Sequence, residues 1–377
     1  MSVVVRRVTS PAGDPAWLVS GYDPIRQLLT DPRLGMSHPD PGSAARLSES
    51  VIFGQPRPSS PTEREDHAWI RRLLARSFSA RRLASLRPRV QHLVDGLLAD
   101  LARQTPPVDF HEAISFPLPA LVICELLGVP FEDRDDFRRW SDEAADMSDQ
   151  ARSSAGLAAL WQYIGRLVAR KLEEPAEDVL SDLVAVHREN PEGFPLDRVA
   201  ELGAGLLFAG HETTVGAIDR GVLLLLSNPD QREALARDPE LVPAAVEEIL
   251  RSLFVEPEDT DRVGGLPRWT NTEITIEGVT IPAGDLVLLD VRGANHDEDV
   301  FGAPEVFDVG RANNPHLTFG HGPHFCAGAS LARMELQALF GTLFDRFPAL
   351  RLAVPVESIQ ARKFRLTGGL EKLPVTW

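Results

Sequence analysis

Residues 316–336 read HLTFGHGPHFCAGASLARMEL and carry the strongest pattern in the chain. The spacing F-x-x-G-x-x-x-C-x-G, which ends just before a stretch that favours a helix, is filled by Phe319, Gly322, Cys326 and Gly328. Glycines let the main chain turn without a Cβ clash, and backbone N–H groups near a sulfur temper the charge of a thiolate. The dipole of the following helix also favours a thiolate. The pattern predicts a cysteine thiolate that binds a metal; the alternative is a glycine-rich turn around a buried cysteine.

The composition is that of a folded, acidic protein. The 377 residues are 43% hydrophobic and 25% charged, and the formal net charge is -16. Nucleic-acid binding is not expected, because phosphate backbones demand a surplus of Lys and Arg. No apolar run is long enough to span a membrane and the first residues do not read as a signal peptide, so we expect a cytoplasmic protein without membrane contact. The two cysteines, Cys124 and Cys326, are too few for a disulfide framework.

Apolar residues recur at three- and four-residue steps over much of the chain, which predicts amphipathic helices. Such helices are expected at 81–101, 115–128, 155–172, 176–188, 197–226, 229–237 and 240–252. Strand patterns gather at 273–290, where Glu277-Gly278 reads as the turn of a hairpin. No linker divides the chain near its middle. We therefore expect a mainly α fold with a minor β region (α+β), formed by one large domain over residues 1–377.

The cysteine loop resembles that of the cytochrome P450 family, and the resemblance continues in order from about residue 17 to the C-terminus. It implies the cytochrome P450 fold, haem b as cofactor and Cys326 as the axial thiolate ligand of the haem iron. Phe319 would contact the same haem. Ala327 departs from the pattern, since bacterial members often have a bulkier residue there.

The sequence AGHETT in the expected helix 197–226 places Ala209 and Thr213 one turn apart on the same face, with Gly210 leaving room beside them. A threonine within a helix can bond back to the carbonyl four residues earlier and open a notch where dioxygen could sit. The resemblance implies that Ala209 and Gly210 lie against the haem, and that Glu212 and Thr213 are an acid–alcohol pair that supplies protons for dioxygen activation. His211 points off this face, and no metal role is assigned to it. Alone, the pattern also suits a solvated helix face.

The propionates of a haem need cations or hydrogen-bond donors from separated segments. His67 and Arg71 lie four residues apart on one helical face, and the resemblance adds Arg268 and His324 to this set. The stretch between Arg251 and Arg268 is several residues longer than the family pattern leads us to expect. Arg262 is therefore a competing candidate for the place of Arg268.

Glu248 and Arg251 form the pattern E-x-x-R, whose spacing allows a charge-assisted pair on one side of a helix. In general such a pair is a surface salt bridge. The resemblance implies instead a buried pair that joins Arg311 in bracing the cysteine loop, with a role in the fold and none in the chemistry.

A basic cluster stands out in this acidic chain and consists of Arg64, Arg71, Arg72, Arg76, Arg81 and Arg82. The resemblance places it beside the thiolate side of the haem, where an acidic electron donor could dock. A solvated helix face is the alternative. The chain contains no flavin or iron–sulfur motif, so electrons from NAD(P)H would arrive through a separate ferredoxin and ferredoxin reductase. We expect the oxygenase itself to be a monomer.

The substrate pocket would be lined, by the same resemblance, by the loops 36–66 and 253–267, the helix face near Leu206 and Ala209, and the turn near Thr367. Resemblance to actinobacterial members suggests hydroxylation or epoxidation of a small organic molecule with O2, in macrolide-like or polyketide-like antibiotic biosynthesis. Two other hypotheses keep the haem. One is a haem-thiolate peroxygenase or isomerase that needs no reductase, and the other is a non-enzymatic haem sensor.

Overall fold

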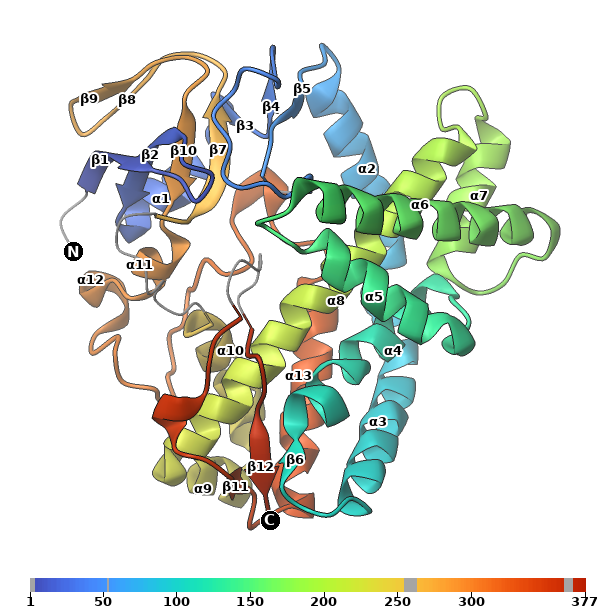
Figure 1. The fold of residues 1–377 in the computed structure, drawn as a ribbon, viewed down its shortest axis with the longest axis vertical. Coiled ribbons are helices and arrows are strands. Elements are labelled where there is room, and N and C mark those ends of the chain that lie inside the picture. Colours follow the sequence, from blue (N-terminus) through green and yellow to red (C-terminus); the bar gives the residue numbers. More distant parts are fainter. Residues whose placement is uncertain (1–3, 53, 254–262, 363–368) are drawn as a thin grey trace.

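Helices form most of the molecule in a computed structural model that describes residues 4–52, 54–253, 263–362 and 369–377. Among these residues the longest helix is α8 (Leu196–Ser227), which runs diagonally through the middle of the molecule (Figure 1). The other helices are α1 (Tyr22–Leu28), α2 (Glu63–Ser77), α3 (Ala80–Ala102), α4 (Pro117–Leu127), α5 (Arg134–Ala144), α6 (Gln150–Glu173), α7 (Val179–Glu189), α9 (Pro229–Arg237), α10 (Val242–Arg251), α11 (Val291–Asn295), α12 (Glu298–Phe301) and α13 (Ala329–Arg346). Short helical turns lie at His111–Ser115, a π-helical turn, and at Phe131–Asp133, Pro239–Leu241, Gly322–His324 and Val356–Ser358.

Helix α3 illustrates how the apolar spacing determines the helical body. Its buried residues follow the predicted three- and four-residue steps and are Leu83, Leu86, Val90, Val94, Leu98 and Leu101. This stripe packs on α13 and α4, while α8 packs on α4, α6, α7 and α10. The prediction of a mainly helical protein is confirmed.

The β region is small, and its larger sheet lies at one side of the helices (Figure 1). Its main sheet has the order β1-β2-β10-β7-β3. The strands of that sheet are β1 (Val4–Thr9), β2 (Pro15–Ser20), β3 (Leu34–Gly35), β7 (Leu266–Thr270) and β10 (Leu286–Leu289). The smaller sheets contain β4 (Ser37–His38), β5 (Arg57–Pro58), β6 (Val108–Asp109), β8 (Ile274–Ile276), β9 (Val279–Ile281), β11 (Arg351–Leu352) and β12 (Pro374–Thr376).

The hairpin predicted around Glu277-Gly278 is confirmed as β8 and β9. Both turn residues have positive φ angles, 49° at Glu277 and 78° at Gly278. Two-residue hairpin loops favour this conformation because its twist matches that of the strands. Other predicted boundaries shift by a few residues, since Asp178 caps α7 with its side chain and α4 begins at Pro117 after the π-helical turn.

The hydrophobic core is divided between the helical body and the β region. One large cluster of buried side chains surrounds α8, and two smaller clusters lie against the main sheet. Within the described ranges, no helix combines the length and the apolar character that a membrane crossing requires.

Candidate functional site

The cysteine loop is a tight turn that depends on its glycines. The N–H of Cys326 donates to the carbonyl of Phe319 at 2.8 Å. Gly320 and Gly322 have φ angles of 72° and 69°, which side chains with a Cβ rarely adopt. A Cβ on Gly322 would also lie 2.5 Å from the side chain of Thr30. The glycines therefore shape the loop as the sequence predicted.

The side chain of Cys326 is exposed to solvent and lies just before α13, for which Gly328 is the N-cap. Burial by the surrounding protein nevertheless raises the pKa of its thiol. Backbone N–H groups of Gly328 and Ala329 and the charges of Arg71 and Arg333 lower this pKa, but by less. The groups expected to stabilise a thiolate are therefore present, but their effect on the pKa of the thiol is smaller than that of burial. A positively charged metal bound to the sulfur would complete the stabilisation.

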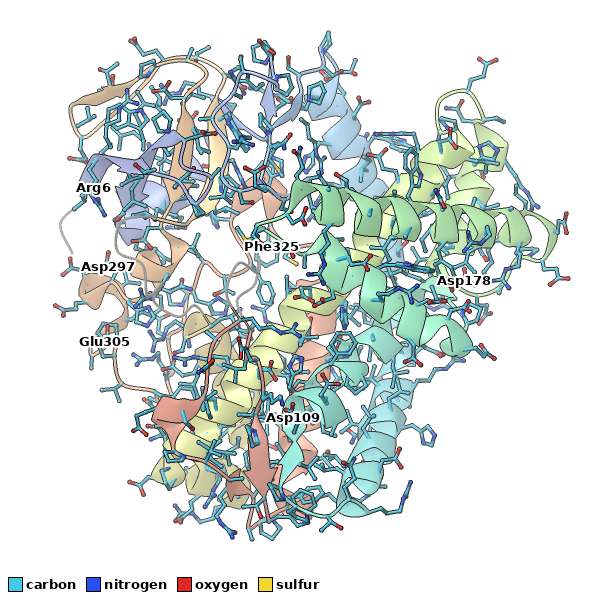
Figure 2. The ribbon with its side chains drawn as sticks, in the orientation of Figure 1. Arg6, Asp109, Asp178, Asp297, Glu305 and Phe325 are labelled. Atoms are coloured by element: carbon cyan, nitrogen blue, oxygen red, sulfur yellow. The ribbon has the colours of Figure 1, made fainter. Side chains whose placement is uncertain are left out.

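Phe319 supports the loop from within. Its ring lies edge-on to Phe325 with centroids 6.2 Å apart, and the guanidinium of Arg333 lies 4.6 Å from its centroid. Phe325 is 39% exposed and lies near the centre of the molecule (Figure 2). A large apolar side chain that is open to solvent beside the cysteine loop suits the wall of a cofactor site.

On α8, Ala209 and Thr213 are exposed although this helix crosses the middle of the molecule. Thr213 Oγ1 donates to the carbonyl of Ala209 at 3.1 Å, which is the predicted bond to the residue four positions earlier. Ala209 and Thr213 therefore share one exposed face of α8, where the threonine hydroxyl competes for a carbonyl of the helical ladder.

The remaining residues of this turn face elsewhere. A Cβ on Gly210 would lie 2.7 Å from Ile123, so the room that this glycine leaves is filled by α4. Glu212 is 5% exposed, and His211, which is fully buried, lies with Nε2 3.2 Å from the carbonyl of Phe116. His211 thus points off the exposed face, as predicted.

His67 and His324 lie together, with ring centroids 4.2 Å apart. Burial lowers the pKa of His324 to about 4, and the neighbouring His67, Arg268 and Arg71 add to this effect. Burial and the charge of Arg71 also lower the pKa of His67. Both rings are consequently neutral at pH 7 and can each donate one N–H to an anion.

Arg268, on β7, is 6% exposed, and burial lowers the pKa of its guanidinium to about 10. Its guanidinium donates to the carbonyl of Pro267 at 2.8 Å, and no carboxylate pairs with it within the ranges that the structure describes. A buried cation that the described residues provide with a carbonyl but no carboxylate needs an anion. Arg268, Arg71 and the two histidines therefore fit the carboxylates of haem. The competing Arg262 lies outside the described residues.

Comparisons with known proteins agree with this arrangement. A family model described as Cytochrome P450 matches residues 167–362. The chain is 42% identical to the pentalenolactone synthase of Streptomyces exfoliatus, over 97% of this chain and 91% of that enzyme. The chain belongs to the cytochrome P450 family. It is also 40% identical to the vitamin D(3) 25-hydroxylase of Pseudonocardia autotrophica, over 99% of this chain and 90% of that P450.

Solved structures of P450 enzymes share the fold. The substrate-free structure of PimD, a cytochrome P450 described as a polyene macrolide antibiotic pimaricin epoxidase, matches with a TM-score of 0.84 and 41% identity. The match covers 99% of this chain and 92% of that one. As a member of this family, the protein is a monooxygenase that contains haem b and inserts one atom of O2 into an organic molecule, with electrons from partner proteins.

The predicted brace of the P450 cysteine loop is confirmed. Glu248 and Arg251 are fully buried and share two hydrogen bonds of 2.8 Å. Arg311 and Asn314 each donate to Glu248 at 3.0 Å. Glu248 therefore accepts hydrogen bonds from three side chains, which offsets the burial of its charge.

A second brace was not predicted from the sequence. Glu247 accepts two hydrogen bonds of 2.7 Å from Arg333 of α13 and lies 3.1 Å from His316 at the start of the cysteine loop. Burial acts to raise the pKa of Glu247, but its bonds with Arg333 and His316 outweigh burial and lower the pKa to about 2. The three partners are far apart in the sequence, so no local pattern could indicate them.

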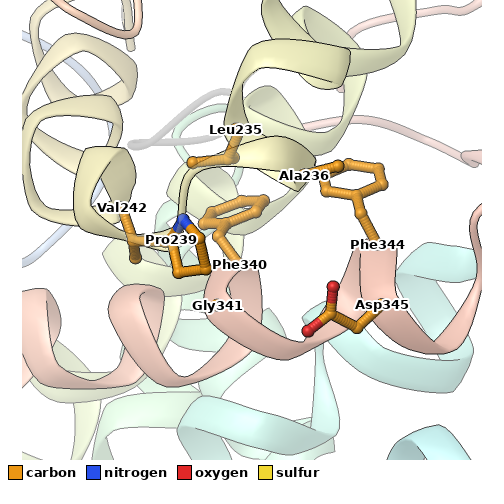
Figure 3. A pocket seen from close by; sticks show the side chains of 8 residues that line it. All are labelled: Leu235, Ala236, Pro239, Val242, Phe340, Gly341, Phe344 and Asp345. Carbon is orange, nitrogen blue, oxygen red and sulfur yellow. The ribbon is translucent and has the colours of Figure 1, made fainter.

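Two surface features lie outside the candidate haem site. An apolar crevice between α9, α10 and α13 is lined by Phe340 and Phe344, and its free space of about 10 Å³ holds one water at most (Figure 3). A groove of about 280 Å³ lies between the start of α3 and α13. Arg87 and Met334 line this groove.

Proposed function

We propose that Cys326 is the axial thiolate ligand of the haem iron, and that His67, Arg71, Arg268 and His324 bind the haem propionates. The buried guanidinium of Arg268 carries this proposal, because burial leaves it in need of an anion close to His324, two residues before the thiol. Phe319, Ala209 and Gly210 would complete the contacts with the ring, the glycine through its backbone.

The haem, when bound, supplies the activation of dioxygen and the transfer of one oxygen atom. We propose that the protein controls the protons. The Thr213 hydroxyl, fixed by its bond to the carbonyl of Ala209, holds a hydrogen-bond network at the exposed face of α8. Glu212, buried one residue earlier, is the proton source for that network.

The substrate that we propose is a small organic molecule of secondary metabolism, such as a macrolide or polyketide, which is hydroxylated or epoxidised. Support comes from relatives named as a pentalenolactone synthase and a pimaricin epoxidase. Leu206, one turn before Gly210 and half-buried, would border the pocket with loop 36–66. Thr367 and most of the 253–267 segment lie outside the described residues.

A ferredoxin is the electron donor that we propose, served by its reductase. Arg72, Arg76 and Arg81 are exposed around the end of α2 and the start of α3, which borders the groove against α13. Arg82 is already paired with Asp182 and is left out of the docking surface. An acidic partner that docks here would lie near the start of α13, the helix that follows Cys326.

We further propose that residues 1–377 form one domain that acts as a cytoplasmic monomer. The large cluster of buried side chains that joins α3, α8 and α13 supports the single domain.

Turnover under ¹⁸O2 tests the proposed reaction. With NAD(P)H, a ferredoxin and its reductase, we expect one labelled oxygen atom in each product molecule and no product when ferredoxin is omitted. Product formed from hydrogen peroxide at an equal rate, with or without ferredoxin, would replace this proposal by a peroxygenase. A haem protein that forms no product with any candidate substrate, yet changes affinity for a partner with its haem state, would be a sensor.

A further inference from the structure

A buried ion pair joins the π-helical turn to α8 at a place that the proposed chemistry does not use. His111 Nδ1 lies 2.7 Å from Asp219 Oδ2, and the two side chains are 1% and 0% exposed. Asp219 follows Thr213 by six residues on the same helix. Burial of two charges costs solvation free energy that their attraction often fails to return, so stability alone is a weak reason for the pair.

The pair is also incompletely satisfied. Within the part of the chain that the structure describes, His111 Nε2, Asp219 Oδ1 and the hydroxyl of Ser115 are buried without a hydrogen-bond partner. Ser115 ends the same π-helical turn that His111 begins. Buried polar atoms of this kind are uncommon and often mark a functional constraint. Replacing a buried ion pair by apolar side chains is often neutral or stabilising, so we look for the contribution of this pair in the position of α8 rather than in stability.

The same segment, 111–116, holds α8 a second time. The carbonyl of Phe116 lies 3.2 Å from His211 Nε2, and the two rings meet edge-on with centroids 4.4 Å apart. His211 stands two residues before Thr213, so this contact lies on the opposite side of α8 from the exposed face. Segment 111–116 therefore contacts α8 at two places, at His211 within the AGHETT turn and at Asp219 about two turns later.

Two threonines of α8, in the AGHETT turn, bond back to carbonyls four residues earlier. The hydroxyls of Thr213 and Thr214 donate to the carbonyls of Ala209 and Gly210, at 3.1 and 3.5 Å. Side-chain bonds of this type compete with the helical ladder and loosen it. Helices bend or kink where this ladder is disturbed, so contacts from outside help to keep such a turn in place.

We propose that His111 and Asp219 are positioning residues: their buried pair, together with the contact between Phe116 and His211, fixes residues 209–214 of α8 so that the Thr213 hydroxyl stays at the exposed face. This inference rests on the proposed role of Thr213, but the holding of α8 can be measured without it.

The contact between His111 and Asp219, and with it the positioning of α8, depends on pH. Burial acts to lower the pKa of His111, but the hydrogen bond and charge of Asp219 outweigh burial and raise it. Asp109 acts in the same direction and Arg362 opposes it. A raised pKa in the folded state means that the stabilisation is complete below the ordinary histidine pKa and is lost as the pH rises through the raised value. Above that pH, His111 no longer supplies the positive charge of the pair.

Hydrogen–deuterium exchange of peptides that cover residues 206–216 tests the inference. We expect Asp219→Asn to accelerate exchange there by about tenfold at pH 6, since local opening follows the loss of a local contact. The control is Lys171→Met, which removes another largely buried ion pair, with Asp178, between α6 and the start of α7. Residues 206–216 should keep wild-type exchange in Lys171→Met.

The wild-type protein provides a second measurement, which stands even if Asp219→Asn fails to fold. After correction for intrinsic rates, exchange of residues 206–216 should accelerate as the pH rises through the raised pKa of His111. In Asp219→Asn this acceleration should vanish, and more of the consumed NAD(P)H should appear as hydrogen peroxide.

Unchanged exchange in Asp219→Asn, equal acceleration in Lys171→Met, or pH-independent exchange in the wild type would overturn the inference. Failure of the proposed function would appear elsewhere, as a haem spectrum without thiolate character, and would leave the exchange results intact.

Discussion

At the level of single residues, the Thr213 hydroxyl separates oxygenase chemistry from mere haem binding. We predict that Thr213→Ala still consumes NAD(P)H but diverts most of the electrons to hydrogen peroxide, so that product per NAD(P)H falls about tenfold or more. The ratio of product to peroxide measures this. Thr214→Ala is the matched control, because Thr214 is buried and its hydroxyl also bonds one turn back. Equal uncoupling in both variants would mean that helix geometry, not the exposed hydroxyl, is responsible.

Arg268 tests the propionate assignment. We predict that Arg268→Gln releases haem about tenfold faster, since a charge-assisted hydrogen bond contributes roughly 1.5–3 kcal/mol. Transfer of haem to an apo-globin measures the release rate. Arg7→Gln is the control, because Arg7 belongs to the same sheet but is exposed and paired with Asp285. If Arg262→Gln releases haem and Arg268→Gln does not, Arg262 takes the assigned role.

Spacing along the sequence indicated the candidate site residues, and it predicts which face of a helix each side chain occupies. Ala209 and Thr213 lie on one face of α8 as their spacing predicted, and this face is exposed. Spacing along the sequence could not reveal the protonation state of His324, because this residue is neutral through burial and through arginines from distant segments. It also could not reveal that Ile123 of α4 fills the room beside Gly210.

At the level of elements, Glu247 links α10 to α13 and to the cysteine loop. We predict that Glu247→Gln lowers the free energy of unfolding by about 1–2 kcal/mol at pH 7, a value reduced for its partial exposure. The pKa of Glu247 is about 2 in the folded protein against 4.5 for a free carboxyl. Its stabilisation is therefore present above pH 4.5 and is lost as the pH falls towards 2.

Denaturant unfolding at several pH values measures this difference. The gap between wild type and Glu247→Gln should narrow steadily below pH 4.5, whereas Glu233→Gln, at an exposed position of α9, should match the wild type throughout. A gap that is constant with pH would show that Glu247 acts through packing and not through its charge.

Helices with strong apolar periodicity could be predicted, and elements that depend on distant partners could not. Helix α3 and the β8–β9 hairpin follow local patterns. Helix α5 was missed because its sequence, RDDFRRWSDEA, is dominated by charge. Strands β1 and β2 were also missed: β1 reads VVRRVT without alternation, and β2 is ordered by parallel pairing with β10, about 270 residues later.

At the level of the whole molecule, a basic surface on an acidic protein should attract an acidic partner. We predict that the double variant Arg72→Glu with Arg76→Glu slows reduction by ferredoxin about tenfold or more at low salt. Raising the ionic strength should slow the wild type and narrow the difference. Stopped-flow reduction under carbon monoxide measures the rate.

Arg166→Glu with Arg170→Glu, at exposed positions of α6, changes the net charge equally and is the control. If both double variants slow reduction equally, net charge and not a docking surface governs the encounter. If neither does, the electron donor binds elsewhere.

The ligand of the haem iron is measured most directly by the absorption spectrum of the reduced protein with carbon monoxide. A thiolate from Cys326 predicts a Soret band shifted strongly to the red in the wild type and in Cys124→Ser, and loss of that shift in Cys326→His. A histidine-type spectrum in the wild type, or a red-shifted band that survives in Cys326→His, would contradict the assignment of Cys326.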